Sequence, residues 1–276
     1  MRLIRADKPI GSLLLMWPML WALWVVSNGS PHPGVLLVFV VGTFLMRSAG
    51  CAINDFADRH IDGSVARSSQ RPIVTGAVTP TEALITAAVL ALCSFALVLT
   101  MNRLTVLMSF VGVVLAAVYP FSKRITYWPQ LVLGLAFGWA VPMVSSAQTG
   151  AVQPVAWVIF GGAILWALAY DTIYAMVDRR DDVKLGVKST AIWLGNKDVA
   201  AVAVTLLAVL ALLLLVGIWQ GLGLWFFIGW LAGLGVACYQ LWLIRDREEA
   251  ACFKSFNVSN YMGFAIFLGL VVDLSV

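Results

Sequence analysis

Charged residues are scarce in this chain, and their scarcity excludes an ordinary water-soluble domain. They make up 12% of the 276 residues, about half the share that is typical of soluble proteins, while 61% of the residues are hydrophobic. Histidine occurs only twice, and the four cysteines show no paired spacing. The sequence therefore lacks both a zinc-binding pattern and a disulfide framework, and we expect the cysteines to pack in or beside helices.

Long apolar runs fill most of the chain. A helix needs about 20 apolar residues to cross a bilayer, and nine stretches meet this requirement. They lie near residues 11–27, 34–53, 83–101, 104–121, 129–148, 154–177, 199–218, 222–243 and 257–274. We therefore predict an all-α integral membrane protein with nine transmembrane helices, which forms a single domain over residues 1–276.

The basic residues give the orientation of these spans. If the N-terminus is cytoplasmic, all of the 18 Lys and Arg residues except Arg47 and Arg103 fall on the cytoplasmic side. Arg103 lies on the opposite side, and Arg47 lies inside the second span. The net charge of +4 then follows from orientation and from anionic lipid, so we expect no nucleic-acid partner.

Two acidic sets stand where apolar spans reach the cytoplasmic side. Carboxylates near hydrocarbon are costly and are usually functional. At 100° per residue the acids of each set fall within about 60° of one another on a helix. The first set is Asn54, Asp55, Asp58 and Asp62, and the second is Asp171, Asp178 and Asp182.

Oxygen ligands without His or Cys favour Mg²⁺ over zinc or iron. Asn54, Asp55, Asp58 and Asp62 are the predicted ligands of one ion, and Asp178 and Asp182 those of a second. The alternative is that these acids cap helices or neutralise neighbouring arginines. Two sets on one membrane face, each followed by basic residues, favour metal binding.

The two longest cytoplasmic connections, 54–82 and 178–198, each begin with an acidic set and continue with basic residues. This similarity indicates a diverged repeat of helices 1–4 and 5–8. Arg67, Arg71, Lys184 and Lys188 are suited to clamp a diphosphate that two Mg²⁺ ions bridge. Because the walls are apolar, a lipid diphosphate fits, with its tail leaving between helices into the bilayer.

Two further basic segments have two readings. Lys123 and Arg124 follow the fourth span, and Lys8 precedes the first. Each segment is either a flank that anchors its helix at the membrane surface or a site for the carboxylate of a small acidic acceptor. A cation or phosphate transporter is the rival function, but transporters place polar residues near the midplane. Both acidic sets lie at one face, which favours an enzyme.

At these residues the chain resembles the intramembrane aromatic prenyltransferase superfamily, which shares an N-D-x-x-D-x-x-x-D motif and a second D-x-x-x-D motif. The matching stretches cover nearly the whole chain in order: residues 5–15, 50–59, 71–76, 119–124, 170–179 and 188–192. The resemblance implies nine helices around a central cavity, Mg²⁺ dependence and a polyprenyl diphosphate donor. It also implies 4-hydroxybenzoate as the acceptor, alkylated ortho to its hydroxyl in ubiquinone biosynthesis; homogentisate, dihydroxynaphthoate and haem are the alternative acceptors.

The resemblance assigns roles to individual residues. Arg124 is expected to position the acceptor or the diphosphate, while Asp171 and Asp178 are the remaining catalytic candidates. Asp178 is expected to accept the phenol proton. We further expect a multi-pass protein of the bacterial inner membrane, with its active site at the cytoplasmic face and no obligate protein partner.

Overall fold

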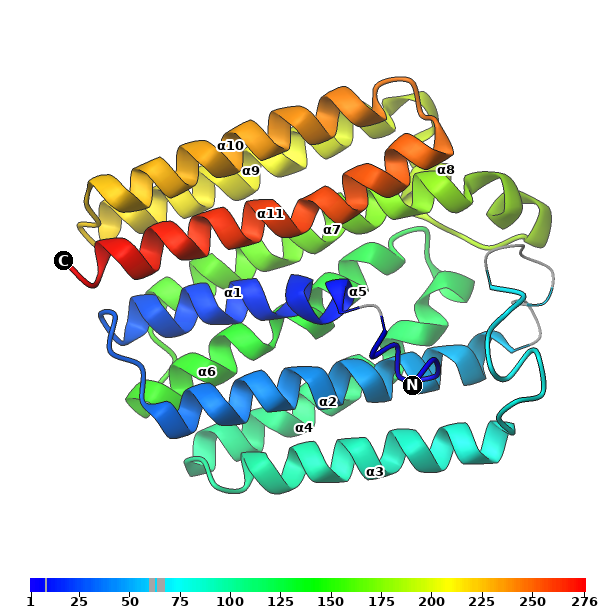
Figure 1. The fold of residues 1–276 in the computed structure, drawn as a ribbon, viewed down its shortest axis with the longest axis horizontal. Helices are drawn as coiled ribbons and strands as arrows, with labels where there is room; N and C mark the ends of the chain where they lie inside the picture. Colours follow the sequence, from blue (N-terminus) through cyan, green and yellow to red (C-terminus); the bar gives the residue numbers. More distant parts are fainter. Residues whose placement is uncertain (8, 60–62, 64–67) are drawn as a thin grey trace.

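Helices make up almost all of the structure. The computed structural model describes residues 1–7, 9–59, 63 and 68–276, and none of these residues lies in a strand. The helices run lengthwise beside one another (Figure 1). Their bounds are α1 (Ile10–Val26), α2 (Pro33–Asp58), α3 (Pro80–Val98), α4 (Arg103–Ile125), α5 (Pro129–Gly138), α6 (Ala140–Thr149), α7 (Pro154–Leu185), α8 (Thr190–Leu194), η2 (Gly195–Lys197), α9 (Asp198–Trp219), α10 (Leu224–Ile244) and α11 (Glu249–Asp273).

Eight of the predicted spans coincide with helical segments long and apolar enough to cross a membrane, counted within the described residues and taking the consecutive α5 and α6 as one segment. The predicted first span coincides with α1, an apolar helix of 17 residues. As expected, α2 and α7 continue past their apolar stretches, and they end at Asp58 and Leu185. Asn54, Asp55 and Asp58 of the first set and Asp178 and Asp182 of the second therefore lie on helical extensions of the apolar spans.

The predicted span 129–148 is broken into two helices, α5 and α6, at Trp139. Pro142 explains the break, since its ring displaces the carbonyl of residue 138 and its nitrogen donates no hydrogen bond. The Trp139 indole instead donates to the Met108 carbonyl oxygen of α4 at 2.9 Å. The break therefore brings an aromatic side chain against α4 in the middle of the span.

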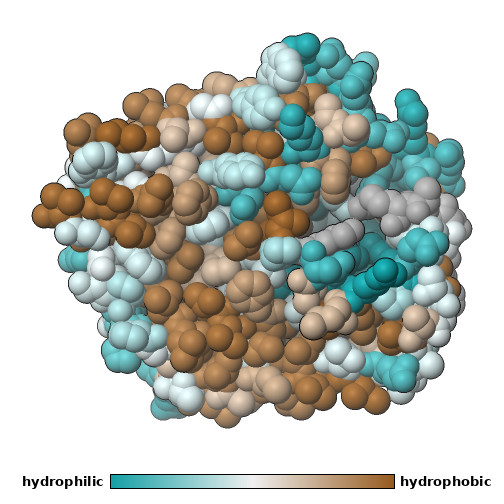
Figure 2. Space-filling view, in the orientation of Figure 1, coloured by the Kyte–Doolittle hydropathy of each residue, from teal (hydrophilic) through white to brown (hydrophobic). Residues whose placement is uncertain are grey.

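Burial separates inner helices from outer ones. Trp21 and Leu23 of α1 and Ile173 of α7 are fully buried, whereas Leu92 of α3 and Val204 of α9 are 66% and 67% exposed. Exposed apolar side chains form a broad band over the middle of the molecule (Figure 2). Such a band is what helices facing hydrocarbon require.

Glycines allow α10 and α11 to pack closely. A Cβ atom at Gly229 would lie 2.6 Å from the Ala265 carbonyl oxygen and 2.9 Å from the Gly269 Cα atom. Both of these are backbone atoms, so a side chain could not be accommodated by a rotamer change. Gly235, on the same helix, has open space at its Cβ position.

We predict that Gly229→Leu destabilises the protein while Gly235→Leu leaves its stability nearly unchanged. Overpacking costs about 1–3 kcal/mol, which corresponds to a fall in Tm of at least about 3 °C. Thermal unfolding of the purified protein in detergent measures the difference. Equal Tm values for the two variants would contradict close packing at Gly229.

Candidate active site

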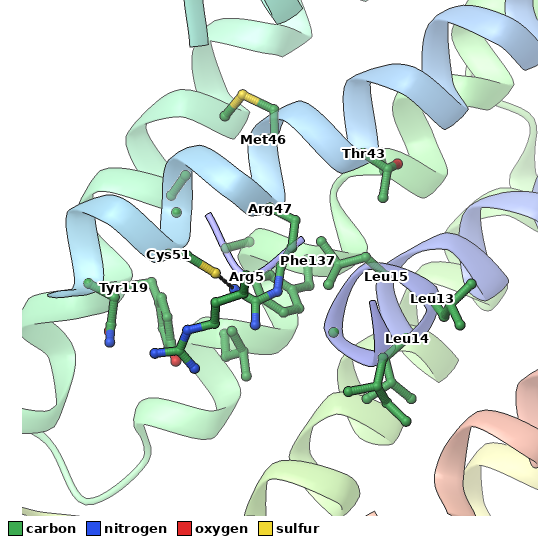
Figure 3. A pocket seen from close by; sticks show the side chains of 18 of the residues that line it. Arg5, Leu13, Leu14, Leu15, Thr43, Met46, Arg47, Cys51, Tyr119 and Phe137 are labelled. Atoms are coloured by element: carbon green, nitrogen blue, oxygen red, sulfur yellow. Dashed lines mark hydrogen bonds between the residues drawn. The ribbon is translucent and has the colours of Figure 1, made fainter. Parts of the chain in front are cut away.

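A large cavity lies among α1, α2, α3, α4, α5, α6, α7 and α11, and its volume is about 1330 Å³. Its polar end is lined by Asn54, Asp55, Arg71 and Asp171, and its opposite part is lined by apolar side chains. Figure 3 shows α1 and α2 bordering this space. One cavity therefore presents a charged end and a hydrocarbon-like end.

A smaller pocket of about 170 Å³ adjoins the polar end and brings the two acidic sets together. Asn54 and Asp171 line both spaces, so the two spaces lie next to each other. The acidic-set residues that line the smaller pocket are Asn54, Asp58, Asp171, Asp178 and Asp182. These five residues, drawn from both sets, therefore line one pocket.

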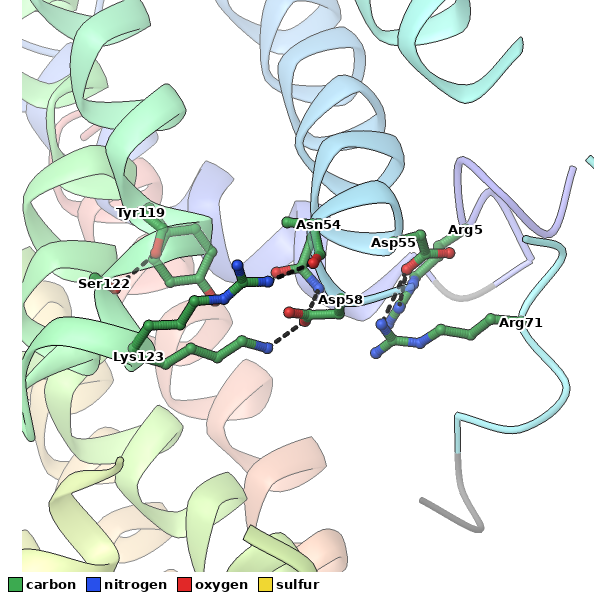
Figure 4. A network of polar contacts seen from close by, with 10 residues as sticks. Arg5, Asn54, Asp55, Asp58, Arg71, Tyr119, Ser122 and Lys123 are labelled. Atoms are coloured by element: carbon green, nitrogen blue, oxygen red, sulfur yellow. Dashed lines mark hydrogen bonds and ion pairs between the residues drawn. The ribbon is translucent and has the colours of Figure 1, made fainter. Parts of the chain in front are cut away.

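Asp55 is buried between two arginines. Its side chain is fully buried, and its Oδ1 atom lies 3.1 Å from both Arg5 Nη2 and Arg71 Nη1 (Figure 4). Leu3 is buried against α2 and α3, which holds the N-terminal segment in reach of Asp55. Arg5 adopts a φ of 51°, a conformation that costs free energy for a non-glycine residue.

Asp58 lies one turn further along α2 and pairs with Lys123 of α4 (Figure 4). Its side chain is 3% exposed, and Asn54 Nδ2 donates to Asp58 Oδ2 at 3.2 Å. Asp55 and Asp58 are thus neutralised by cations from three different segments. A buried carboxylate without such partners would be strongly destabilising.

The donor atoms present fit a hard cation. Asp55 Oδ2 and Asp58 Oδ1 are buried and have no hydrogen-bond partner. No three Asp, Glu, His or Cys side chains converge into a complete metal site within the described part of the chain. Since Mg²⁺ commonly takes only one or two carboxylates and completes its shell with substrate phosphates, this partial oxygen set suits it.

Only some of the predicted basic residues line the smaller pocket. Lys123, Arg71 and Lys188 line the smaller pocket. Arg124 is exposed and outside the residues that line either space, and its Nη2 atom donates to the Ala57 carbonyl oxygen at 2.5 Å. Lys184 is likewise exposed and lies 3.3 Å from Asp181.

The diphosphate- and acceptor-binding roles predicted for Arg124 and Lys184 thus have no support from their placement. Neighbouring residues on a helix point about 100° apart, and here Lys123 lines the smaller pocket while Arg124 does not. Lys8, Asp62 and Arg67 lie outside the described residues, and their predicted roles stay predictions.

Arg47 is a site residue that the sequence analysis left without a role. It lies in the middle of α2, lines the cavity and donates to Cys51 Sγ (Figure 3). Its Nε atom is buried and has no hydrogen-bond partner. A Cβ atom at Gly11 of α1 would lie 2.6 Å from the guanidinium, so glycine there leaves space for it. An arginine inside an apolar span was the available signal, because intramembrane charges are usually functional.

A buried ion-pair cluster braces the end of α7. Asp198 at the start of α9 is fully buried; it pairs with Arg179 of α7 and lies 2.8 Å from Arg247 Nη2. Hydrogen bonding to this carboxylate raises the pKa of Arg247, which lies in the α10–α11 loop, above its ordinary value. Because Arg179 follows Asp178 directly, the cluster fixes the rotation of the helix that carries the second acidic set.

The comparisons agree with this geometry. The model of the UbiA prenyltransferase family matches residues 15–267. The chain belongs to this family.

Close relatives cover almost the full chain. The 4-hydroxybenzoate octaprenyltransferase of Aeromonas salmonicida is 54% identical over 272 residues, which are 99% of this chain and 94% of that protein. The protein of the same name from Vibrio cholerae serotype O1 is 53% identical over 273 residues, 99% of this chain and 96% of that protein.

Solved structures share the fold. The UbiA homolog from Aeropyrum pernix K1, in its apo form, has a TM-score of 0.84 at 25% identity and covers 96% of this chain and 98% of that one. A UbiA homolog from Archaeoglobus fulgidus bound to GPP and Mg²⁺ has a TM-score of 0.74 at 18% identity, with 96% and 98% covered. These helices therefore adopt the fold of the solved UbiA homologs.

We predict that Asp198→Ala lowers the free energy of unfolding by about 3–5 kcal/mol, because it leaves two arginines without their buried partner. The matched variant is Asp246→Ala, which removes an exposed carboxylate 3.0 Å from Arg245. This exposed pair contributes less than about 1 kcal/mol. Thermal or chemical unfolding in detergent compares the two, and similar losses would contradict the bracing role.

Proposed function

We propose that this protein transfers a polyprenyl group from polyprenyl diphosphate to carbon 3 of 4-hydroxybenzoate, releasing diphosphate. The observation that carries the proposal is the single cavity with acidic and basic side chains at one end and apolar walls beyond. An anionic head and a hydrocarbon tail on one substrate match these two ends. The relatives that share more than half of the sequence carry the name of this activity.

We further propose nine membrane spans, a cytoplasmic N-terminus and a catalytic end at the cytoplasmic face of a bacterial inner membrane. The support is the distribution of Lys and Arg, of which all but Arg47 and Arg103 fall on one side of the nine-span topology. Hydrophilic residues gather at one end of the molecule in Figure 2. The C-terminal ends of α2 and α7 lie at the same end in Figure 1.

For the metal, Asn54, Asp55 and Asp58 would hold one Mg²⁺, and Asp178 and Asp182 would hold a second. Bound there, the ions would neutralise the diphosphate and make it a better leaving group. Arg71 and Lys123 already lie at this end, where they neutralise Asp55 and Asp58. With substrate present, these two cations can turn from the carboxylates to phosphate oxygens, so the net charge of the site stays balanced.

The bond between carbon 1 of the prenyl chain and the diphosphate oxygen breaks, and its electron pair leaves with the diphosphate. The ring of 4-hydroxybenzoate then forms a bond from carbon 3 to carbon 1 of the allylic cation. The ring regains aromaticity by losing the proton at carbon 3. Asp171 lines both spaces and Asp178 lines the smaller one, so these carboxylates are the proposed bases for the phenol and ring protons.

Arg47 is the proposed partner of the acceptor carboxylate. Its guanidinium points into the cavity and retains an unpaired nitrogen, and Arg47 lies about two turns of α2 deeper than Asn54. A carboxylate bound there would leave the phenol end of the ring near Asp171, which lines the cavity together with Tyr119 and Tyr170. Apolar and aromatic walls exclude water from the cation, which protects it from hydrolysis.

The activity is tested by incubating membranes that contain the protein with 4-hydroxybenzoate, octaprenyl diphosphate and Mg²⁺. We expect prenylated product that EDTA abolishes and added Mg²⁺ restores. Asp58→Asn should lower the rate by about 100-fold or more, because even the partners of metal ligands contribute 10- to 100-fold. Asp246→Asn, at an exposed acid, should keep the rate. No product with the unaltered protein would refute the function, whereas EDTA-resistant product would refute only the metal.

The acceptor site is tested by Arg47→Gln. Hydrogen bonds to charged groups contribute about 1.5–3 kcal/mol, so the KM for 4-hydroxybenzoate should rise about 10- to 100-fold. The KM for the donor should stay within about threefold, and Arg103→Gln on the opposite side should change neither value. A rise in the KM for the donor of the same size would instead assign Arg47 to the diphosphate.

A further inference from the structure

Gln130 is a buried polar residue that the proposed mechanism does not use. It is the second residue of α5, its exposed fraction is 4%, and it lines the smaller pocket together with Pro129. A polar side chain that is shielded from bulk water normally has hydrogen-bond partners for its donors and its acceptors. The partners of Gln130 therefore indicate what this side chain does at the edge of the pocket.

One end of the Gln130 amide is held by the chain segment that follows α7. The backbone N–H of Thr190 donates to Gln130 Oε1 at 3.2 Å, and Thr190 is itself fully buried. The Thr190 hydroxyl lies 2.7 Å from the hydroxyl of Thr172 on α7, so this contact is anchored next to Asp171 in the chain. Because a backbone N–H needs an acceptor, the end of the amide that faces Thr190 must be its oxygen.

The other end of the amide is therefore its NH2 group. Gln130 Nε2 donates no hydrogen bond to any residue that the structure describes. Arg71 and Lys123, which line the same pocket, are held by carboxylates. The Nζ atom of Lys188 donates to the Ile125 carbonyl oxygen at 3.1 Å. The two N–H groups of a neutral amide thus remain for a ligand that accepts hydrogen bonds.

The helix that carries Gln130 favours the same kind of ligand. Its first two residues, Pro129 and Gln130, both line the smaller pocket, and its N-cap residue Trp128 provides no side-chain cap. The N–H groups of a first helical turn carry a partial positive charge, which attracts anions. The amide donors and the start of α5 therefore both favour an oxygen anion in the smaller pocket.

We infer that Gln130 donates hydrogen bonds to the terminal phosphate of the prenyl donor and thereby makes the site selective for a diphosphate over a monophosphate. This inference rests on the proposed function, which places the head of the donor at the acidic sets. Asn54 and Asp171 line both spaces and so mark their junction. The phosphate bonded to the prenyl carbon must lie near this junction, because that carbon reacts inside the large cavity. The terminal phosphate then lies in the smaller pocket, which Gln130 lines.

Two substitutions separate the two ends of the side chain. In Gln130→Glu, one carboxylate oxygen still accepts from the Thr190 N–H, whereas the other replaces the NH2 group and repels a phosphate. In Gln130→Met, both polar groups are lost from a side chain of similar length. Gln148 offers a matched control, because its Oε1 atom accepts from the backbone N–H of His32 at 3.1 Å and it lines neither space.

The experiment measures the Kd values of geranyl diphosphate and geranyl monophosphate for the purified protein by isothermal titration calorimetry, with Mg²⁺ present and the acceptor absent. In Gln130→Glu and in Gln130→Met, we expect the Kd for the diphosphate to rise about 10- to 100-fold and the Kd for the monophosphate to stay within about threefold. Gln148→Glu should match the unaltered protein with both ligands.

The outcomes separate the inference from the function on which it rests. An unchanged or lowered Kd for geranyl diphosphate in Gln130→Glu overturns the inference and leaves Gln130 only its contact with Thr190. An equal loss with both ligands also overturns it, because a general disturbance of the pocket does not depend on the second phosphate. If Gln130→Met does not fold, as thermal unfolding would show, Gln130→Glu decides alone, since it keeps the acceptor for Thr190. An unaltered protein that binds geranyl diphosphate but forms no prenylated 4-hydroxybenzoate counts against the proposed function alone.

Discussion

Buried carboxylates at the end of an apolar helix are the constraint on which the rest of this structure depends. The side chains of Asp55 and Asp58 are 0% and 3% exposed, and an uncompensated charge at such a position is strongly destabilising. The compensating cations come from the N-terminal segment, the α2–α3 connection and α4. Neutralising one short stretch of α2 therefore draws three separate segments of the chain around the polar end of the cavity.

The same requirement prepares the site for an anionic substrate. Each carboxylate keeps one buried oxygen without a hydrogen-bond partner, so neither is fully satisfied by its cation. Those oxygens could coordinate a divalent ion. The diphosphate bound with that ion would give Arg5, Arg71 and Lys123 new partners. The packing of this end and its proposed chemistry thus depend on one set of charges.

The sequence predicted the helices well because hydrophobic length is a local property. It predicted the meeting of the two acidic sets because both stand at the same membrane face. It did not predict the break at Trp139, although Pro142 was visible, since a proline in a span produces either a kink or a break depending on its neighbours. The pairing of Arg5 with Asp55, 50 residues apart, and the burial of Asp198 between Arg179 and Arg247 depend on tertiary packing that periodicity does not contain.

Arg47 shows how one residue divides the cavity into two chemical regions. An arginine at that depth costs free energy unless polar groups or water reach it, and its neighbours Gly11 and Cys51 provide space and a single weak acceptor. An acidic acceptor bound to it would end at the guanidinium and would leave the apolar residues beyond to the prenyl tail. The head of the donor, the ring of the acceptor and the tail would then meet at the level between Asn54 and Arg47, which is where carbon 1 must lie for the new bond to form.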